Sequence, residues 1–385
     1  ISVCSRMTQL HEPQVRVAAL SLFTRVAALP LAIGAVFPVA AQTQLAQAAT
    51  EPQLRETVVT ATRVARPLAD LVADVSIVDR ETNESWVPLK HLAADQARFD
   101  IYDSFLSEYA AMGFEYGYSV AAPEALVCWE AQYGDFSNGG QIIIDEFIAS
   151  GFAKWTQKSG VVLLLPHGYE GAGPDHSSAR IERFLQLCVN NNLAVCQPST
   201  PASYFHLLRQ HAQVNWHRPV IIATPKSMLR NKLAMSMPED FTTGKWRPIQ
   251  GDPTIEDPGT VKRILLCSGK VRWELVRERI RMGLDQQVAI ITLERLFPHG
   301  HAELAAVLAN YPQVGDYRWI QEEPENQGPW EFLKLHLVPL MSETFGREFV
   351  LRPFTREPAA AASTGSPRVH MIEEDALLQA ALSDD

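Results

Sequence analysis

Beyond residue 85, short apolar runs alternate with segments in which apolar residues recur at helical spacing. Strands are predicted over 125–131, 161–166, 193–199 and 217–225, and helices over 109–120, 140–155, 178–190 and 201–213. The run VVLLLP at 161–166 is apolar throughout, which is typical of a strand in a parallel sheet covered on both faces. Strands that alternate with helices predict a doubly wound parallel sheet.

A second alternation of the same kind follows a stretch rich in Pro, Gly, Asp and Thr. Strands are predicted over 261–269, 287–298 and 317–324, and helices over 273–283, 301–312, 330–341 and 373–383. Residues 356–370 are expected to form a surface loop. We therefore predict an α/β domain over 85–235, a linker over 236–260 and a smaller C-terminal α/β domain over 261–385.

Residues 1–84 differ from the rest of the chain. An uncharged stretch at 26–41 follows Arg16 and Arg25 and ends in small residues, which is typical of a secretory signal. A buried Ala-rich helix is the alternative. The sequence ETVVTATR at 56–63 resembles the TonB box of outer-membrane TonB-dependent receptors, although Thr and Val also favour ordinary strands. We expect residues 1–84 to be a poorly ordered, receptor-like leader.

Composition limits the classes of partner. The chain carries 34 Lys+Arg and 44 Asp+Glu, a formal net charge of −10, which has the wrong sign for a general nucleic-acid binder. No membrane contact is predicted for the α/β body. The five cysteines of the whole chain are odd in number and widely spaced, which favours reduced thiols and a cytoplasmic protein.

The glycine-rich loop PHGYEGAGPDHSSAR, residues 166–180, directly follows the apolar strand. The spacing Gly171-x-Gly173 is not completed as a dinucleotide motif, because residue 176 is His. The chain holds no G-x-S-x-G sequence, and His167 and His176 lack the spacing of a zinc site. We interpret the loop as one whose imidazoles meet an anionic or carbonyl substrate.

Two further segments carry candidate side chains. Glu108 opens a predicted helix rich in small residues, where a first-turn carboxylate interacting with the helix dipole is the simpler explanation. The sequence WEAQYGDF at 129–136 places Tyr133 and Phe136 just after a strand. Such aromatics are often core residues, but α/β folds bind ligands at the carboxyl ends of their strands.

Several long motifs in one order resemble a known family. They are LSEYAAMGFEYGYSV, WEAQYGDFSNGGQIIIDEFI, LLLPHGYEGAGPDHSSARIERFLQL, PSTPASYFHLLRQ, TPKSMLR and QEEPENQGPW. Together they resemble the C-terminal part of the thiamine-diphosphate-dependent decarboxylating component of 2-oxoglutarate dehydrogenase, from about Trp86 to the end of the chain. The resemblance implies a transketolase-like pyrimidine-binding domain followed by a smaller C-terminal α/β domain.

The resemblance also implies roles for single residues. Glu108 matches the glutamate that hydrogen-bonds a pyrimidine nitrogen of thiamine diphosphate and thereby favours the tautomer that removes the thiazolium proton. His176 matches a substrate-facing histidine, and His167 is a second expected substrate contact. Tyr133 or Phe136 is expected to stack on the aminopyrimidine. Weaker candidates, expected to be structural, are Arg180 and Lys226.

Departures from the family pattern are also present. Ala172 stands where relatives carry a polar Gln, and Phe152 where they carry an acidic residue. The upstream domain that holds the diphosphate and its Mg²⁺ is not recognisable in this sequence. We therefore expect the chain to be inactive alone, because both halves are needed to orient the cofactor.

The family implies a homodimer and a lipoyl-bearing succinyltransferase component as partner. Two alternatives to this interpretation stay open. In the first, the chain is a noncatalytic partner of a separate diphosphate-binding chain. In the second, it is part of a TonB-dependent receptor.

Overall fold

The computed structural model describes residues 88–384 except 103, 105, 215 and 216, together with the backbone of 77–78 and 85–86. The chain divides into two compact units, and everything from residue 101 onward belongs to one of them. The other unit contributes strands β1 (Ile77–Val78) and β2 (Ser85–Trp86), which pair antiparallel, and the 3-10 helix η2 (Pro88–His91). The predicted signal at 26–41 and the TonB-box-like residues 56–63 lie outside the described residues.

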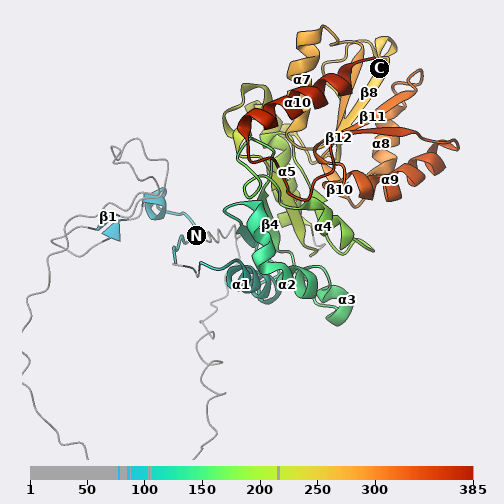
Figure 1. Ribbon diagram of the computed structural model, residues 1–385. Coiled ribbons are helices and arrows are strands. Elements are labelled where there is room, and N and C mark those ends of the chain that lie inside the picture. Colours follow the sequence, from blue (N-terminus) through green and yellow to red (C-terminus); the bar gives the residue numbers. More distant parts are fainter. Residues whose placement is uncertain are drawn as a thin grey trace, which may run out of the picture. The chain divides into compact units, whose positions relative to one another are not determined.

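The first sheet has the strand order β10-β5-β6-β4-β3 (Figure 1). Its strands are β3 (Cys128–Glu130), β4 (Val162–Pro166), β5 (Ala194–Cys196), β6 (Val220–Thr224) and β10 (Arg295–Phe297). The first four are mutually parallel, whereas β10 runs antiparallel to β5. Because β10 comes from the second half of the chain, this strand ties the two halves together.

Helices cover both faces of this sheet. They are α1 (Glu108–Ala121), α2 (Gln141–Ile143), α3 (Gly151–Trp155), α4 (Ile181–Gln186) and α5 (Pro201–Gln213), with the 3-10 helix η3 (Gly134–Gly140) and the π-helix η4 (Ile144–Ile148). Alternate residues of β4 serve the two faces: Val162 packs in the α5 cluster, and Leu163 and Leu165 in the α1 and α4 cluster. This double burial is why the predicted strand is apolar throughout.

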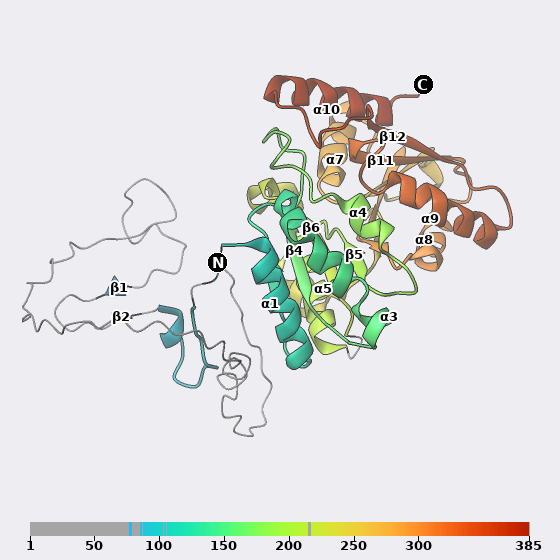
Figure 2. The ribbon, with the colours of Figure 1, turned by 60° about the horizontal axis from the view of Figure 1, so that its bottom comes forward.

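The second sheet has the strand order β12-β11-β8-β9-β7. Its strands are β7 (Ile249–Gln250), β8 (Arg263–Cys267), β9 (Val288–Leu293), β11 (Asp316–Pro324) and β12 (Leu351–Arg356), all parallel except β7. Helices α7 (Val271–Met282) and α10 (Pro367–Leu382) cover one face, and α8 (His301–Leu308) and α9 (Trp330–Phe345) lie on the other (Figure 2). The predicted class, a doubly wound α/β fold with a second α/β domain, is confirmed.

The predicted elements differ from the structure in a few places. The helix expected over 140–155 is broken into α2, η4 and α3, with Thr156 ending it at a φ of 52°. The last helix begins earlier than expected, at Pro367 after the Ser366 cap, and β12 was not predicted. The stretch expected as a linker, 236–260, contains the short helix α6 (Pro238–Thr243) and the edge strand β7.

The hydrophobic core runs through both sheets. One cluster extends from Met112 of α1 to Leu351 of β12 without a break between the halves. Cys188, Cys196 and Cys267 are free thiols, and burial raises the pKa of Cys196 and Cys267 to about 12. Among the described helices, none is long and apolar enough to cross a bilayer.

Candidate functional site

Glu108 is the first residue of α1 and lies against η3. Ser107 caps the helix, since its side chain accepts from the Ala110 N–H, so the carboxylate of Glu108 sits in the first turn. A Cβ added at Gly139 would lie 3.3 Å from Glu108 Oε2, so the absence of a side chain there leaves room beside the carboxylate. Among the described residues, none forms a hydrogen bond with this carboxylate, which leaves it able to accept one from a bound molecule.

Three rings meet at the carboxyl edge of the first sheet. The ring centroids of Tyr133 and Phe136 are 5.5 Å apart, and His176 lies 4.2 Å from Tyr133 and 5.9 Å from Phe136, edge-on to both. Lys226 Nζ lies 3.6 Å from the Tyr133 ring centroid and donates to the Gln132 carbonyl at 2.6 Å. Tyr133 is thus occupied by a cation and two rings, whereas Phe136 contacts two rings only.

The glycine-rich loop is bonded to itself and to η3. The Gly168 N–H donates to the Ser177 carbonyl at 2.9 Å, and the Ser177 hydroxyl donates to the Gly173 carbonyl at 2.7 Å. Asp135 Oδ1 accepts from the Ser178 N–H at 3.2 Å. Burial raises the pKa of Asp135, although backbone hydrogen bonds, that from the Ser178 N–H first, oppose the shift. His176 is therefore carried on a loop anchored beside Phe136.

His167 lies behind the loop and not on its open side. The residue is 3% exposed, its Nδ1 accepts from the Ala179 N–H at 3.0 Å, and its Nε2 lies 2.9 Å from Glu323 Oε1. Because Nδ1 accepts a hydrogen bond, the ring proton belongs on Nε2, which donates to Glu323. Burial lowers the pKa of His167, but Glu323, together with Glu322 and Glu182, more than offsets it, so the net shift is upward.

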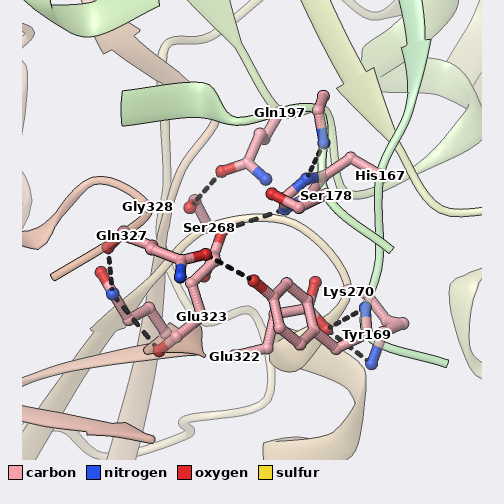
Figure 3. A network of polar contacts seen from close by, with 12 residues as sticks. His167, Tyr169, Ser178, Gln197, Ser268, Lys270, Glu322, Glu323, Gln327 and Gly328 are labelled. Atoms are coloured by element: carbon pink, nitrogen blue, oxygen red, sulfur yellow. Dashed lines mark hydrogen bonds and ion pairs between the residues drawn. The ribbon is translucent and has the colours of Figure 1, made fainter. Parts of the chain in front are cut away.

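A second buried group joins the loop to the second sheet. The Tyr169 N–H donates to Glu322 Oε2 at 3.1 Å, and Lys270 Nζ lies 2.7 Å from the same oxygen and also pairs with Glu274. Burial opposes ionisation here, yet Lys270 keeps the pKa of Glu322 below its usual value. Figure 3 shows these side chains as one network with His167 and Glu323.

The predicted site residues thus divide into two sets. Glu108, Phe136, Tyr133 and His176 gather around η3, while His167 is turned away into the domain interface. Sequence reasoning assigned no role to Asp135, Lys270, Glu322 or Glu323. The paired carboxylates near the end of the buried strand β11 were a visible signal, because charges are rarely buried without partners. Arg180, at a φ of 55°, caps α4, and Lys226 covers Tyr133.

The residues around η3 fit the pyrimidine end of thiamine diphosphate. Glu108 offers an unused acceptor, Gly139 leaves room beside it, and Phe136 offers an aromatic face close by on the same 3-10 helix. In the described part of the chain, no group of three or more His, Cys, Asp or Glu side chains is arranged to hold a metal ion.

Two family models match the chain. Residues 56–232 match the model described as transketolase, pyrimidine binding domain, and residues 235–382 match that described as 2-oxoglutarate dehydrogenase C-terminal. The first match begins inside the stretch expected to form the leader.

Curated relatives are similar over most of this chain. The 2-oxoglutarate dehydrogenase E1/E2 component of Corynebacterium glutamicum is 48% identical over 311 residues, which cover 79% of this chain and 25% of the relative. The multifunctional 2-oxoglutarate metabolism enzyme of Mycolicibacterium vanbaalenii is 50% identical over 315 residues, again 79% of this chain and 25% of the relative. The chain therefore spans about a quarter of the length of these relatives.

Proposed function

We propose that this chain, a transketolase-type pyrimidine-binding domain followed by a 2-oxoglutarate dehydrogenase C-terminal domain, supplies the pyrimidine half of a site that decarboxylates 2-oxoglutarate. The cofactor implied is thiamine diphosphate, which when bound supplies the nucleophilic carbon for 2-oxoacid decarboxylation. The observation that carries the proposal is the unused carboxylate of Glu108, which lies in the capped first turn of α1 and next to Gly139.

Each residue around η3 has a proposed task. Glu108 accepts a hydrogen bond from a pyrimidine nitrogen and thereby favours the ring tautomer that removes the thiazolium proton. Phe136 stacks on the pyrimidine, because Tyr133 is already covered by Lys226. His176, exposed and edge-on to both rings, contacts the substrate. His167 reaches the substrate only through the loop it supports.

The diphosphate and Mg²⁺ are proposed to be held by a polypeptide segment that the described residues do not include. We further propose that the chain acts as a homodimer and that the succinyl group passes to a lipoyl-bearing succinyltransferase component. The Corynebacterium relative is named as an E1/E2 component, which supports association with such a partner.

Decarboxylation of 2-oxoglutarate with thiamine diphosphate and Mg²⁺ tests the proposal, with ferricyanide as electron acceptor. The purified chain is assayed alone and after addition of the Corynebacterium relative from which the matching segment has been removed. We expect carbon dioxide release only in the second mixture. Release by the chain alone would show that it needs no second half, and release in neither mixture would contradict the proposed function.

Replacing Glu108 by Gln is expected to lower this activity by about 10²-fold or more, the scale of lost general acid–base catalysis. Glu124→Gln, at an exposed carboxylate just beyond the other end of α1, is the matched control and is expected to keep full activity. Calorimetric titration with thiamine diphosphate gives a second readout, in which Glu108→Gln weakens binding. Equal rates for the two variants would remove Glu108 from the site.

A further inference from the structure

The loop at 167–180 has two sides with different surroundings. Its open side carries His176, which is exposed beside Tyr133 and Phe136. Its other side lies against the end of β11 and the start of α10 from the second domain. A Cβ added at Gly171 would lie 3.5 Å from His370 of α10, so the loop is covered closely there.

The first link from β11 to the loop passes through one imidazole. Glu323 accepts from His167 Nε2 at 2.9 Å, and His167 Nδ1 accepts from the Ala179 N–H at 3.0 Å. The side chains of His167 and Glu323 are 1% and 4% exposed, so water does not replace either bond. The Glu323 carboxylate thereby selects the tautomer of His167 in which Nδ1 can accept a hydrogen bond from the Ala179 N–H.

The second link is direct. Glu322 accepts from the Tyr169 N–H at 3.1 Å, and Lys270 holds this carboxylate in place at 2.7 Å. The Tyr169 ring is 1% exposed, and its hydroxyl donates to Gln327 at 3.5 Å. Two adjacent carboxylates on one strand are therefore linked to backbone amides near opposite ends of the same loop, Glu322 directly and Glu323 through His167.

The two links bracket His176. Tyr169 and Ala179 stand near the two ends of the loop. The segment between them bonds to itself, to Asp135 and, through Glu170, to the Ser227 N–H at 2.9 Å. Loss of either link loosens a segment that contains Gly171 and Gly173, both at positive φ. The position of the His176 ring then depends on Glu322 and Glu323, which lie more than 140 positions later in the sequence.

We propose that Glu323 and Glu322 are positioning residues for His176: they fix the substrate loop through His167 and through the Tyr169 amide. The catalytic meaning of this inference rests on the proposed function, whereas the anchoring does not. The second domain is thus part of the site without touching the substrate.

Residue-resolved amide hydrogen exchange on the full chain tests the anchoring. Glu323→Leu is expected to speed exchange of the Ala179 amide about tenfold, the factor for loss of one buried hydrogen bond, and to leave the Val220 amide of β6 unchanged. Glu322→Leu is expected to act in the same way on the Tyr169 amide. Glu348→Leu, at an exposed carboxylate of the same domain, is the control.

Rescue by the conservative variant separates positioning from general damage. Glu323→Gln keeps an oxygen that can accept from His167 Nε2, so the Ala179 amide is expected to stay within about twofold of the unmodified chain. Unchanged exchange at Ala179 and Tyr169 in the folded leucine variants would overturn the proposal. So would faster exchange spread evenly over both domains.

One measurement needs no variant. Nitrogen-15 shifts of His167 in the unmodified chain are expected to show the proton on Nε2, and a proton on Nδ1 alone would overturn the proposal even if a leucine variant failed to fold. Anchoring without decarboxylation in the complemented assay would reject the proposed function alone. Full activity of Glu323→Leu in that assay would reject the positioning role alone.

Discussion

At the scale of single residues, the site depends on where a side chain is missing. Gly139 lies on η3 next to Glu108, and Gly117 lies on α1, the helix that Glu108 begins. The surroundings of the two glycines differ. A Cβ at Gly139 would meet the Glu108 carboxylate at 3.3 Å, whereas a Cβ at Gly117 would meet nothing within 4 Å. Neither glycine has a positive φ, so alanine is compatible with both backbones.

Gly139→Ala is expected to lower the complemented decarboxylation rate by roughly tenfold to a hundredfold, because the new methyl group displaces the carboxylate. Its free energy of unfolding is expected to change by less than about 1 kcal/mol. Gly117→Ala is the control and should stabilise α1 by about 0.5–1 kcal/mol without loss of activity. Urea unfolding measures the stability of both variants, and the complemented assay measures their rates. Full activity of Gly139→Ala would argue against a role for the Glu108 carboxylate next to Gly139.

At the scale of elements, the connection from β10 to α8 packs a histidine against α9. The His299 ring stacks on Phe332 at 5.2 Å and lies 6.1 Å from His336, and its Nδ1 is buried without a partner in the described part of the chain. Burial, and then the neighbouring His336 and His301, lower the pKa of His299 to about 4. The folded state therefore holds this ring neutral.

The pH dependence follows from that shift. An unfolded histidine titrates near 6.5, so between about pH 6.5 and 4 the unfolded chain binds a proton at His299 that the folded chain does not. The contribution of His299 to stability should be constant above this window and fall as the pH drops through it. His299→Phe, which keeps the ring contact with Phe332, should flatten this slope in urea unfolding at a series of pH values. Identical slopes would show that His299 is not buried as described.

At the scale of the whole molecule, the two sheets share one core and a charged interface. Lys270, 4% exposed, pairs with Glu322 and Glu274 where the second sheet meets the substrate loop. An ion pair at this depth leaves an uncompensated buried charge when one partner is removed. The exposed pair of Lys334 and Glu331, each 58% exposed, has no such penalty.

Lys270→Met is therefore expected to destabilise the chain by roughly 3–5 kcal/mol. Lys334→Met, the matched control on α9, should change the free energy of unfolding by less than about 1 kcal/mol. Equilibrium urea unfolding at neutral pH measures the difference between the two variants. A similar small effect for both would mean that the interface tolerates an unpaired carboxylate.

Local pattern alone determined most of the elements and part of the site. Apolar runs and helical spacing located the strands and helices, because each depends on burial along a few residues. Helix α5 has the bounds predicted for it, 201–213. The motifs also placed Glu108 at the start of a helix, Phe136 just after a strand and His176 on the loop that follows the next strand, and parallel strands of such folds bind ligands at their carboxyl ends.

Only the tertiary structure decided what faces the open site and what supports it from behind. No local pattern near His167 predicts its partner, since Glu323 lies 156 residues further on. The switch of β10 into the first sheet was equally hidden, because a single strand was predicted over 287–298, where the structure has both β9 and β10. Both features arise from packing one sheet against the other, and that packing depends on contacts between distant segments that no local pattern records.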